Sequence, residues 1–111
     1  MKITFDDFTK VDVRIGTVVD AHCFPEARRP ALKLWVDFGE SLGVKKSSAQ
    51  LTVNYTLEEL IGRQVAAVVN LPPKQVGNFI SEILVLGFPD SGGAVVLLAV
   101  EKAVPNGGRL F

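Results

Sequence analysis

Hydrophobic and polar residues alternate along the first part of the chain with a period of two. Residues 11–24 follow this pattern, but its phase is blurred at Val18 and Val19. An alternating run is typical of a strand with one buried face, and a local break in its phase indicates a bulge or a bend. The pattern therefore predicts a long first strand that bends near Gly16.

A second alternating run follows a turn that contains two prolines and two arginines. Its apolar face is formed by Leu32, Leu34, Val36 and Phe38. Trp35 lies on the opposite, polar face, between Lys33 and Asp37. The next run, residues 44–53, predicts a third and more polar strand.

A short helix is predicted over residues 56–62. Thr56 is a residue type favoured at helix N-caps, two glutamates follow in the first turn, and Gly62 is a typical stop. The paired acids at residues 6–7 are also typical of a helix start, where the helix dipole favours negative charge. Three later apolar runs predict two or three further strands: residues 65–71, 82–88 and 93–100.

Five or six short strands, with one short helix between the third and the fourth, predict an all-β fold. The arrangement favours an OB-fold, which is a five-stranded β-barrel of the oligonucleotide/oligosaccharide-binding type, here with short helices and a C-terminal strand extension. A bend at Gly16 would let the first strand serve both halves of such a barrel. A small sandwich or an SH3-like barrel would show similar alternation.

The size and composition of the chain fit one globular domain. It has 111 residues, of which 48% are hydrophobic and 22% are charged. No apolar run approaches the roughly 20 residues that span a bilayer, and acidic residues occupy the N-terminal stretch where a signal peptide is basic and then apolar. We therefore expect a cytoplasmic protein without membrane insertion.

The charges of the chain are balanced, with twelve basic and twelve acidic residues. A protein that binds by neutralising many phosphates usually has a basic excess, so the balance weakens a nucleic-acid function without excluding it. The sequence still allows a local basic strip across neighbouring strands, formed by Arg28, Arg29, Lys33, Lys45 and Lys46. The alternative is an ordinary solvated charged face.

The sequence contains no pattern typical of catalysis or of metal binding. Cys23 is the one cysteine and His22 the one histidine, too few for an internal disulfide or for a metal site. Because neighbours in a strand point to opposite faces, we expect a packed thiol and an exposed imidazole. There is no nucleophile motif and no glycine-rich phosphate loop. We expect neither an enzyme nor a bound cofactor.

A polar, irregular insertion at residues 70–82 separates two apolar runs that are each suited to a buried strand. Pro72 and Pro73 fix the backbone and remove two donors, so we expect a rigid insertion. Gly77 permits a turn or the close approach of another chain. Side chains along the insertion offer hydrogen bonds or a positive charge to a ligand backbone: Asn70, Lys74, Gln75, Asn78 and Ser81.

Three blocks of the sequence resemble the tRNA-binding domain family, a module that occurs alone or appended to methionyl- and tyrosyl-tRNA synthetases. The blocks are residues 10–39, 45–88 and 104–111. The resemblance covers roughly residues 6–111, which we expect to form a single domain of this type. It implies an OB-fold and, for free-standing members, a homodimer.

Within this family the sequence is most similar to a branch of small bacterial secretion chaperones. The chain has KKSSAQ at residues 45–50, where tRNA-binding members typically have a valine-serine-glycine or valine-alanine-glycine turn. It has Ser81–Glu82 where those members typically have serine-glutamine. A carboxylate at Glu82 repels phosphate and removes two donors, which weighs against tRNA as the ligand.

The resemblance implies that Asn70, Lys74 and Ser81 line the ligand face, because the matching residues line the RNA face in tRNA-binding relatives. We add Glu82 from the same block to this candidate face. Trp35 and Lys46 complete it, since an aromatic ring on the polar face of a barrel strand can stack on bases or cover apolar peptide side chains.

Each of these candidates has a structural alternative. Asn70 would instead satisfy backbone groups at the end of a strand, and Ser81 with Glu82 would attach the insertion to the lysines of the third strand. Trp35 would pack against the turn after the first strand, or lie in a dimer contact.

Two functions from different classes follow. The first is a chaperone that binds unfolded or precursor polypeptides for protein export. The second is a structure-specific tRNA-binding module. Neutral net charge, Glu82 and the KKSSAQ block favour the first, whereas the fold and the set Asn70, Lys74 and Ser81 favour the second.

Apolar residues near both ends of the chain need cover, and we expect a homodimer to provide it. The predicted interface residues are Phe5, Phe8, Leu110 and Phe111. A two-fold copy of the same patch would bury them in an isologous contact. The alternative is that the N-terminal segment caps the open end of its own barrel.

Overall fold

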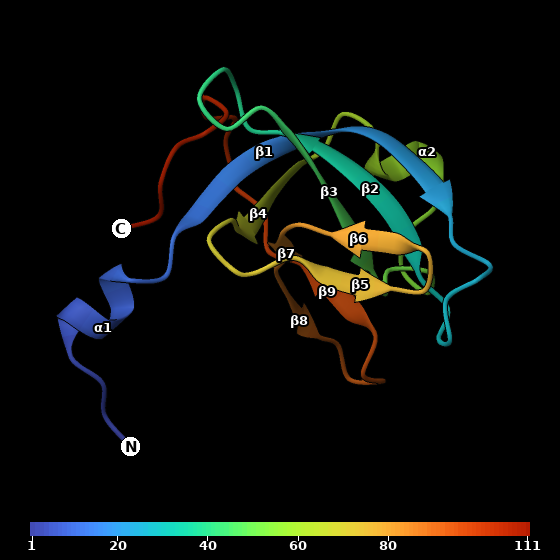
Figure 1. The fold of residues 1–111 in the computed structure, drawn as a ribbon, viewed down its shortest axis with the longest axis horizontal. Helices are drawn as coiled ribbons and strands as arrows, with labels where there is room; N and C mark the ends of the chain where they lie inside the picture. The colour runs from blue at the N-terminus through green and yellow to red at the C-terminus, as the bar shows by residue number, and fades with distance from the viewer.

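The computed structural model describes residues 1–111. Its centre is a five-stranded antiparallel sheet in the order β3-β2-β1-β4-β7, which curls into a nearly closed barrel (Figure 1). The elements are α1 (Phe5–Thr9), β1 (Val13–Cys23), β2 (Leu32–Asp37), β3 (Val44–Ala49), α2 (Leu57–Leu60), β4 (Gln64–Val68), β5 (Lys74–Val76), β6 (Phe79–Ser81), β7 (Leu84–Val85), β8 (Gly87–Pro89) and β9 (Val95–Leu97). The predicted all-β barrel of the OB type, with short helices, is confirmed.

Strand β1 serves both halves of the barrel. Up to Thr17 it pairs with β4, and from Thr17 onward it pairs with β2. The register slips by one residue between Val18 and Asp20, so a bulge lies where the hydrophobic pattern is blurred. At Gly16, β1 and β2 approach each other closely. A Cβ atom added to Gly16 would lie only 2.6 Å from Val36 Cγ1. The predicted long and irregular first strand is confirmed.

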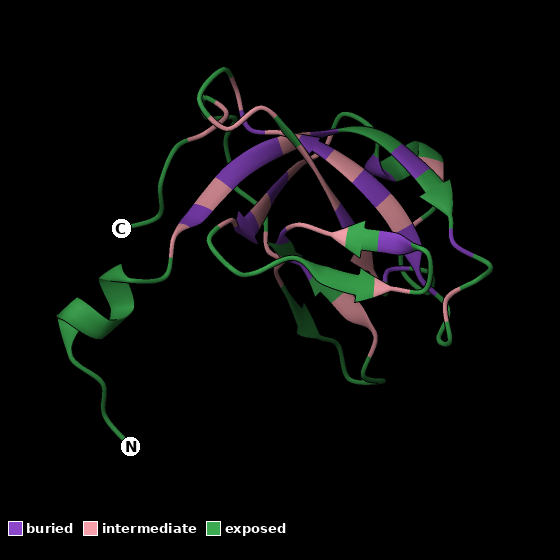
Figure 2. Cartoon of the chain, in the orientation of Figure 1, coloured by how far each residue is buried: buried purple, intermediate pink, exposed green.

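One apolar cluster fills the barrel. The alternation of β2 places Lys33, Trp35 and Asp37 on its half-exposed face, as predicted, and the residues between them in the core. The core consists of Val18, Ala21, Leu32, Leu34, Val36, Phe38, Leu51, Leu60, Val65, Ala67, Ile83 and Leu97 (Figure 2). Strand β3 is shorter than predicted, since the chain turns away after Ala49 toward α2.

Both short helices begin with a capping box. The Thr56 hydroxyl accepts a bond from the backbone N–H of Glu59, and the Glu59 carboxylate accepts one from the N–H of Thr56. Thr4 and Asp7 form the same pair at the start of α1. The predicted helix near residues 56–62 and the helix-start role of the paired acids are confirmed.

The polar insertion folds into the hairpin β5–β6, which lies over β3 (Figure 1). Its two-residue turn consists of Gly77 and Asn78. Gly77 has a φ of +60°, at the position where a type II′ turn needs a positive φ, which glycine adopts without strain. The predicted turn at Gly77 is confirmed.

The apolar run at residues 82–88 is only partly buried, so the expectation of a buried strand is wrong there. Ile83 points into the core, but Leu84 and Phe88 are exposed. Strand β7 pairs through two residues, and the chain then leaves the barrel to form β8. Side chains of a strand alternate between its faces, so Leu84 lies outside between the buried Ile83 and the half-buried Val85.

Helix α1 and the C-terminal segment lie near each other beside the start of β1 (Figure 1). Helix α1 projects away from the barrel, and none of its residues is buried (Figure 2). The C-terminal segment runs along β1, where the N–H of Leu110 donates to the carbonyl oxygen of Val13 at 2.9 Å. It forms one isolated bridge, Arg14 with Arg109, so the predicted C-terminal strand extension is shorter than a strand. Neither helix has the length and apolar sequence needed to cross a bilayer.

Candidate ligand-binding surface

A groove of about 630 Å³ lies between β3, the insertion and β7. We call it the apolar groove. It is lined by Ser48, Ala49, Gln50, Leu51, Leu71, Pro72, Lys74, Val76, Ser81, Glu82, Ile83, Leu84, Val85 and Val95. Most of its wall is aliphatic, and Leu84 offers an exposed side chain, with 50% of its surface accessible. Three of the predicted site residues, Lys74, Ser81 and Glu82, lie in this groove.

Ser81 and Glu82 also hold the barrel closed. The N–H of Glu82 donates to the carbonyl oxygen of Lys46 (2.8 Å), and the Glu82 Oε1 accepts from the N–H of Lys46 (3.1 Å). The Ser81 hydroxyl accepts from the N–H of Ser48 (3.1 Å). The oxygens of these two side chains therefore accept the N–H groups of β3 that a neighbouring strand would otherwise bind through its carbonyl groups. We call this contact between β3 and the end of β6 the seam.

The two sequence blocks that distinguish the chaperone branch form a single structural unit. Ser47, from KKSSAQ, is buried, and its hydroxyl donates to the carbonyl oxygen of Ile83 at 3.3 Å. Ser81 Oγ lies 3.4 Å from Ser47 Oγ. The predicted attachment of the insertion to the third strand is present, but it runs through backbone groups and serines rather than through lysine ammonium groups.

Trp35 and Lys46 belong to a different surface, the outer face of β2 and β3. The Trp35 ring packs edge-on against Phe79 of the insertion, with 6.0 Å between ring centroids, and against His22 at 5.1 Å. The Lys46 ammonium lies 5.2 Å from the centre of the Phe79 ring. The insertion thus supplies its own aromatic ring to the place where a base or an apolar side chain would stack. Trp35 is half buried there.

A second hollow, of about 460 Å³, adjoins the apolar groove along β5. We call it the cationic notch. Its lining comprises Glu26, Ala27, Arg28, Arg29, Ala31, Ser48, Gln50, Lys74, Gln75, Val76 and Gly77. Of the predicted basic strip, only Arg28 and Arg29 lie in the notch, and Lys74 joins them. Lys33 instead lies over the rings of Phe24 and Phe79.

Asn70 binds the segment between α1 and β1, residues 10–12, which we call the N-terminal arm. Its Oδ1 accepts from the N–H of Asp12 (2.9 Å), and its Nδ2 donates to the carbonyl oxygen of Lys10 (2.7 Å). Asp12 in turn binds Arg14 Nε at 2.6 Å and lies 3.5 Å from Arg109 Nε. This network joins the arm, β1 and the C-terminal segment.

The Asp12 carboxylate gives this network a dependence on pH. Its hydrogen bond with Arg14 is the main reason why the pKa of Asp12 lies below its ordinary value. A carboxyl group with a lowered folded-state pKa stabilises the fold above its unfolded pKa of about 4, and this stabilisation is lost as the pH falls through the folded value.

Replacing Asn70 with alanine is expected to loosen the arm. Two hydrogen bonds to backbone groups are lost, at about 0.5–1.5 kcal/mol each, so we expect a loss of about 1–3 kcal/mol in the free energy of unfolding. Amide exchange at Asp12 should accelerate by the corresponding factor, about 5- to 150-fold. Gln75→Ala is the matched control, because that amide bonds only to Gly77 of its own turn. Equal exchange rates in wild type and Asn70→Ala would show that the bonds do not hold the arm.

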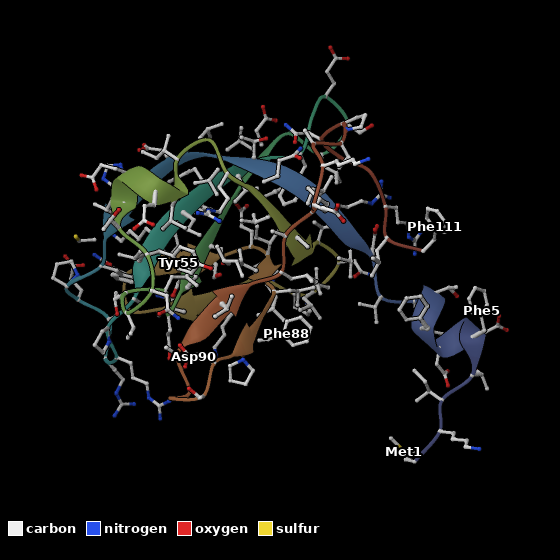
Figure 3. The ribbon with its side chains drawn as sticks, turned by 180° about the vertical axis from the view of Figure 1, so that it is seen from behind. Met1, Phe5, Tyr55, Phe88, Asp90 and Phe111 are labelled. Atoms are coloured by element: carbon white, nitrogen blue, oxygen red, sulfur yellow. The ribbon has the colours of Figure 1, made fainter.

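The four predicted interface residues gather at one end of the molecule. Phe5, Phe8, Leu110 and Phe111 line an open hollow of about 350 Å³ together with Val11, Thr9 and Arg109. We call the seven residues that line this hollow the terminal patch. Figure 3 shows Phe5 and Phe111 on the same side, pointing to solvent. Phe5 is 76% exposed, so the N-terminal segment does not cap its own barrel.

The sequence did not indicate every feature of these surfaces. Leu71, Leu84 and Val95 of the groove were missed, because an apolar run gives no sign of which side chains the barrel leaves outside. The thiol of Cys23 is exposed, contrary to expectation, because the residue ends β1 where the chain leaves the sheet. No group of three or more His, Cys, Asp or Glu side chains is placed to hold a metal ion.

Comparisons with known proteins agree with the fold described above. The family described as "Putative tRNA binding domain" matches residues 13–109. The methionine–tRNA ligase of Methanococcoides burtonii is 40% identical over 105 residues, which are 95% of this chain and 15% of that enzyme. The chain thus spans about one seventh of the length of the curated relatives it matches.

Two solved structures of chaperones match the chain over almost its whole length. The chaperone CsaA from Bacillus anthracis is 52% identical with a TM-score of 0.92, covering 100% of both chains. The CsaA chaperone from Picrophilus torridus is 47% identical with a TM-score of 0.92, covering 99% of this chain and 100% of that one. The resemblance found in the sequence is confirmed, and the chain belongs to the tRNA-binding domain family.

Proposed function

We propose that the protein is a CsaA-like molecular chaperone, a non-catalytic module that binds unfolded or precursor polypeptides for protein export. The observation that carries this proposal is the apolar groove. Unfolded chains expose aliphatic side chains, and a half-open groove lined by leucine, isoleucine and valine lowers the free energy of such side chains by removing them from water. The likeness to two CsaA chaperones over the whole chain supports it.

The groove has a rigid frame, which favours binding. Pro72 stiffens one wall, and the seam bonds of Ser81 and Glu82 fix the other. A preformed site loses little conformational entropy when a ligand enters. Glu82 sits inside the groove, so the groove suits an apolar segment better than a phosphate backbone.

Leu84→Asp tests this proposal. The substitution places a charge on the exposed groove wall, and we expect the affinity for an unfolded polypeptide to fall about tenfold or more, which is about 1.4 kcal/mol. Light scattering during dilution of a chemically unfolded protein measures the loss of aggregation suppression. Ile61→Asp is the control, since Ile61 is 49% exposed and lies after α2, outside the groove. If Leu84→Asp suppresses aggregation as well as Ile61→Asp and the wild-type protein do, the groove does not bind the unfolded polypeptide.

Structure-specific tRNA binding is the second candidate function. The family match and the methionine–tRNA ligase relatives support it. Lys74 and Ser81 are then ligand contacts, and the arginines of the cationic notch supply positive charge. Asn70 contributes by holding the arm, and Trp35 and Lys46 contribute through the neighbouring aromatic face.

We also propose that the protein acts as a homodimer in the cytoplasm, where unexported precursors and tRNA are both present. The terminal patch is the proposed interface, because its exposed phenylalanines adjoin a further apolar hollow of about 410 Å³ that shares Arg109, Leu110 and Phe111. A two-fold copy would cover both. Residues 6–111 form the single domain of this assembly.

A further inference from the structure

The apolar groove and the cationic notch are two parts of one continuous surface. They share Ser48 of β3, Gln50 just after it, and Lys74 and Val76 of β5. A ligand that leaves one hollow therefore enters the other across β5. The hollows differ in chemistry, because one wall is mainly aliphatic and the other carries guanidinium and ammonium groups.

The cations of the notch have no partner within the chain. Arg28, Arg29 and Lys74 form none of the ion pairs of the protein, which join other residues. Glu26 is the one acid in the notch lining. Three positive charges against one negative charge leave the notch with a net positive charge, although the chain as a whole is neutral.

We infer that this surface selects extended polypeptide segments in which an apolar run is flanked by acidic residues. The apolar run fills the groove, and a flanking carboxylate pairs with the arginines of the notch. Arginine suits this role, because its planar fork binds a carboxylate through two parallel hydrogen bonds. The inference rests on the proposed chaperone function and names its substrate class.

A polypeptide fits this surface better than RNA. An RNA strand carries a phosphate at every nucleotide, so a strand that continued from the notch into the groove would meet Glu82 and a largely aliphatic wall. A peptide needs only one or two carboxylates at the notch and presents apolar side chains to the groove. The charge pattern of the surface matches the peptide.

Three labelled peptides with one shared apolar run test the inference by fluorescence anisotropy at physiological salt. They carry flanking pairs of glutamate, glutamine or lysine. We expect the glutamate peptide to bind about tenfold more tightly than the glutamine peptide, and the lysine peptide to bind most weakly. In the variant Arg28→Glu, Arg29→Glu we expect this order to be reversed. Both arginines are exposed in a turn, so the variant should fold.

The control variant is Lys2→Glu, Lys102→Glu, which changes net charge equally at exposed positions outside both hollows. It should keep the wild-type order of peptides. Equal affinity for all three peptides would overturn the inference while leaving the chaperone proposal standing. Absence of binding by any peptide would overturn both. Loss of tRNA binding in the arginine variant, with an unchanged order of peptides, would assign the notch to RNA and overturn the inference.

Discussion

A variant carrying Phe5→Asp and Phe111→Asp is expected to be a monomer at concentrations where the wild-type chain is a dimer. Both rings lie in the terminal patch, and both are exposed in the single chain. Removing a well-buried aromatic anchor from an interface typically costs about 2 kcal/mol or more. In a two-fold contact the two substitutions together remove four such anchors, about 8 kcal/mol in all, so the dissociation constant should rise about 10⁵-fold or more.

Sedimentation equilibrium measures this change directly. The matched control is Phe88→Asp, because Phe88 is 63% exposed and lies on β8, away from the terminal patch (Figure 3). The control should remain dimeric. A monomeric wild-type protein, or a double variant that stays dimeric, would show that the chain ends are not the interface.

Gly16→Ala is expected to destabilise the barrel severely. An added Cβ atom would lie 2.6 Å from Val36 Cγ1, 2.8 Å from Phe38 Cδ1 and 2.9 Å from the backbone oxygen of Asp37. Val36 and Phe38 are fully buried, and a backbone oxygen in a paired strand has no room to move. Overpacking of a core typically costs about 1–3 kcal/mol, and a clash with the backbone places this variant at about 3 kcal/mol or above.

Equilibrium unfolding in urea tests this expectation. The midpoint should fall while the dependence on denaturant stays the same, which indicates a change in stability alone. Gly92→Ala is the control, because a Cβ atom there would meet only the Asp90 carboxylate, at 3.5 Å. A loss below about 1 kcal/mol for Gly16→Ala would mean that β1 and β2 separate more easily than their packing indicates.

The hydrophobic pattern predicted the fold well where strands have one buried face. The alternation of β2 placed Trp35 outside correctly, and the blurred phase at Val18 and Val19 marked the bulge. The pattern gave the wrong burial for residues 82–88, because it does not tell how few residues of β7 pair before the chain leaves the barrel. Burial of an apolar run depends on strand partners that are distant in the sequence.

The candidate site was predicted less completely, for a similar reason. Lys74, Ser81 and Glu82 meet in one groove, whereas Trp35 with Lys46 and Asn70 lie on two other surfaces. Asn70 binds Asp12 and Lys10, which are 58 and 60 residues away in the sequence. No local pattern reports such contacts. The resemblance to the family indicated which residues to consider as the ligand face. It did not indicate that the structure would distribute them over three separate surfaces.

The measurement that tests the central claim most directly compares two ligands in parallel, an unfolded precursor polypeptide and bulk tRNA. Wild-type protein is titrated with each at about 50 and 200 mM salt. Binding of tRNA through three cations has a slope of about −2.7 in log affinity against log salt, so it should weaken about 40-fold over this range.

Binding of the precursor depends mainly on apolar contacts and should change only a few-fold. We therefore expect the precursor to be the tighter ligand at the higher salt concentration. Tight tRNA binding that persists there, with no measurable affinity for the precursor, would contradict the account.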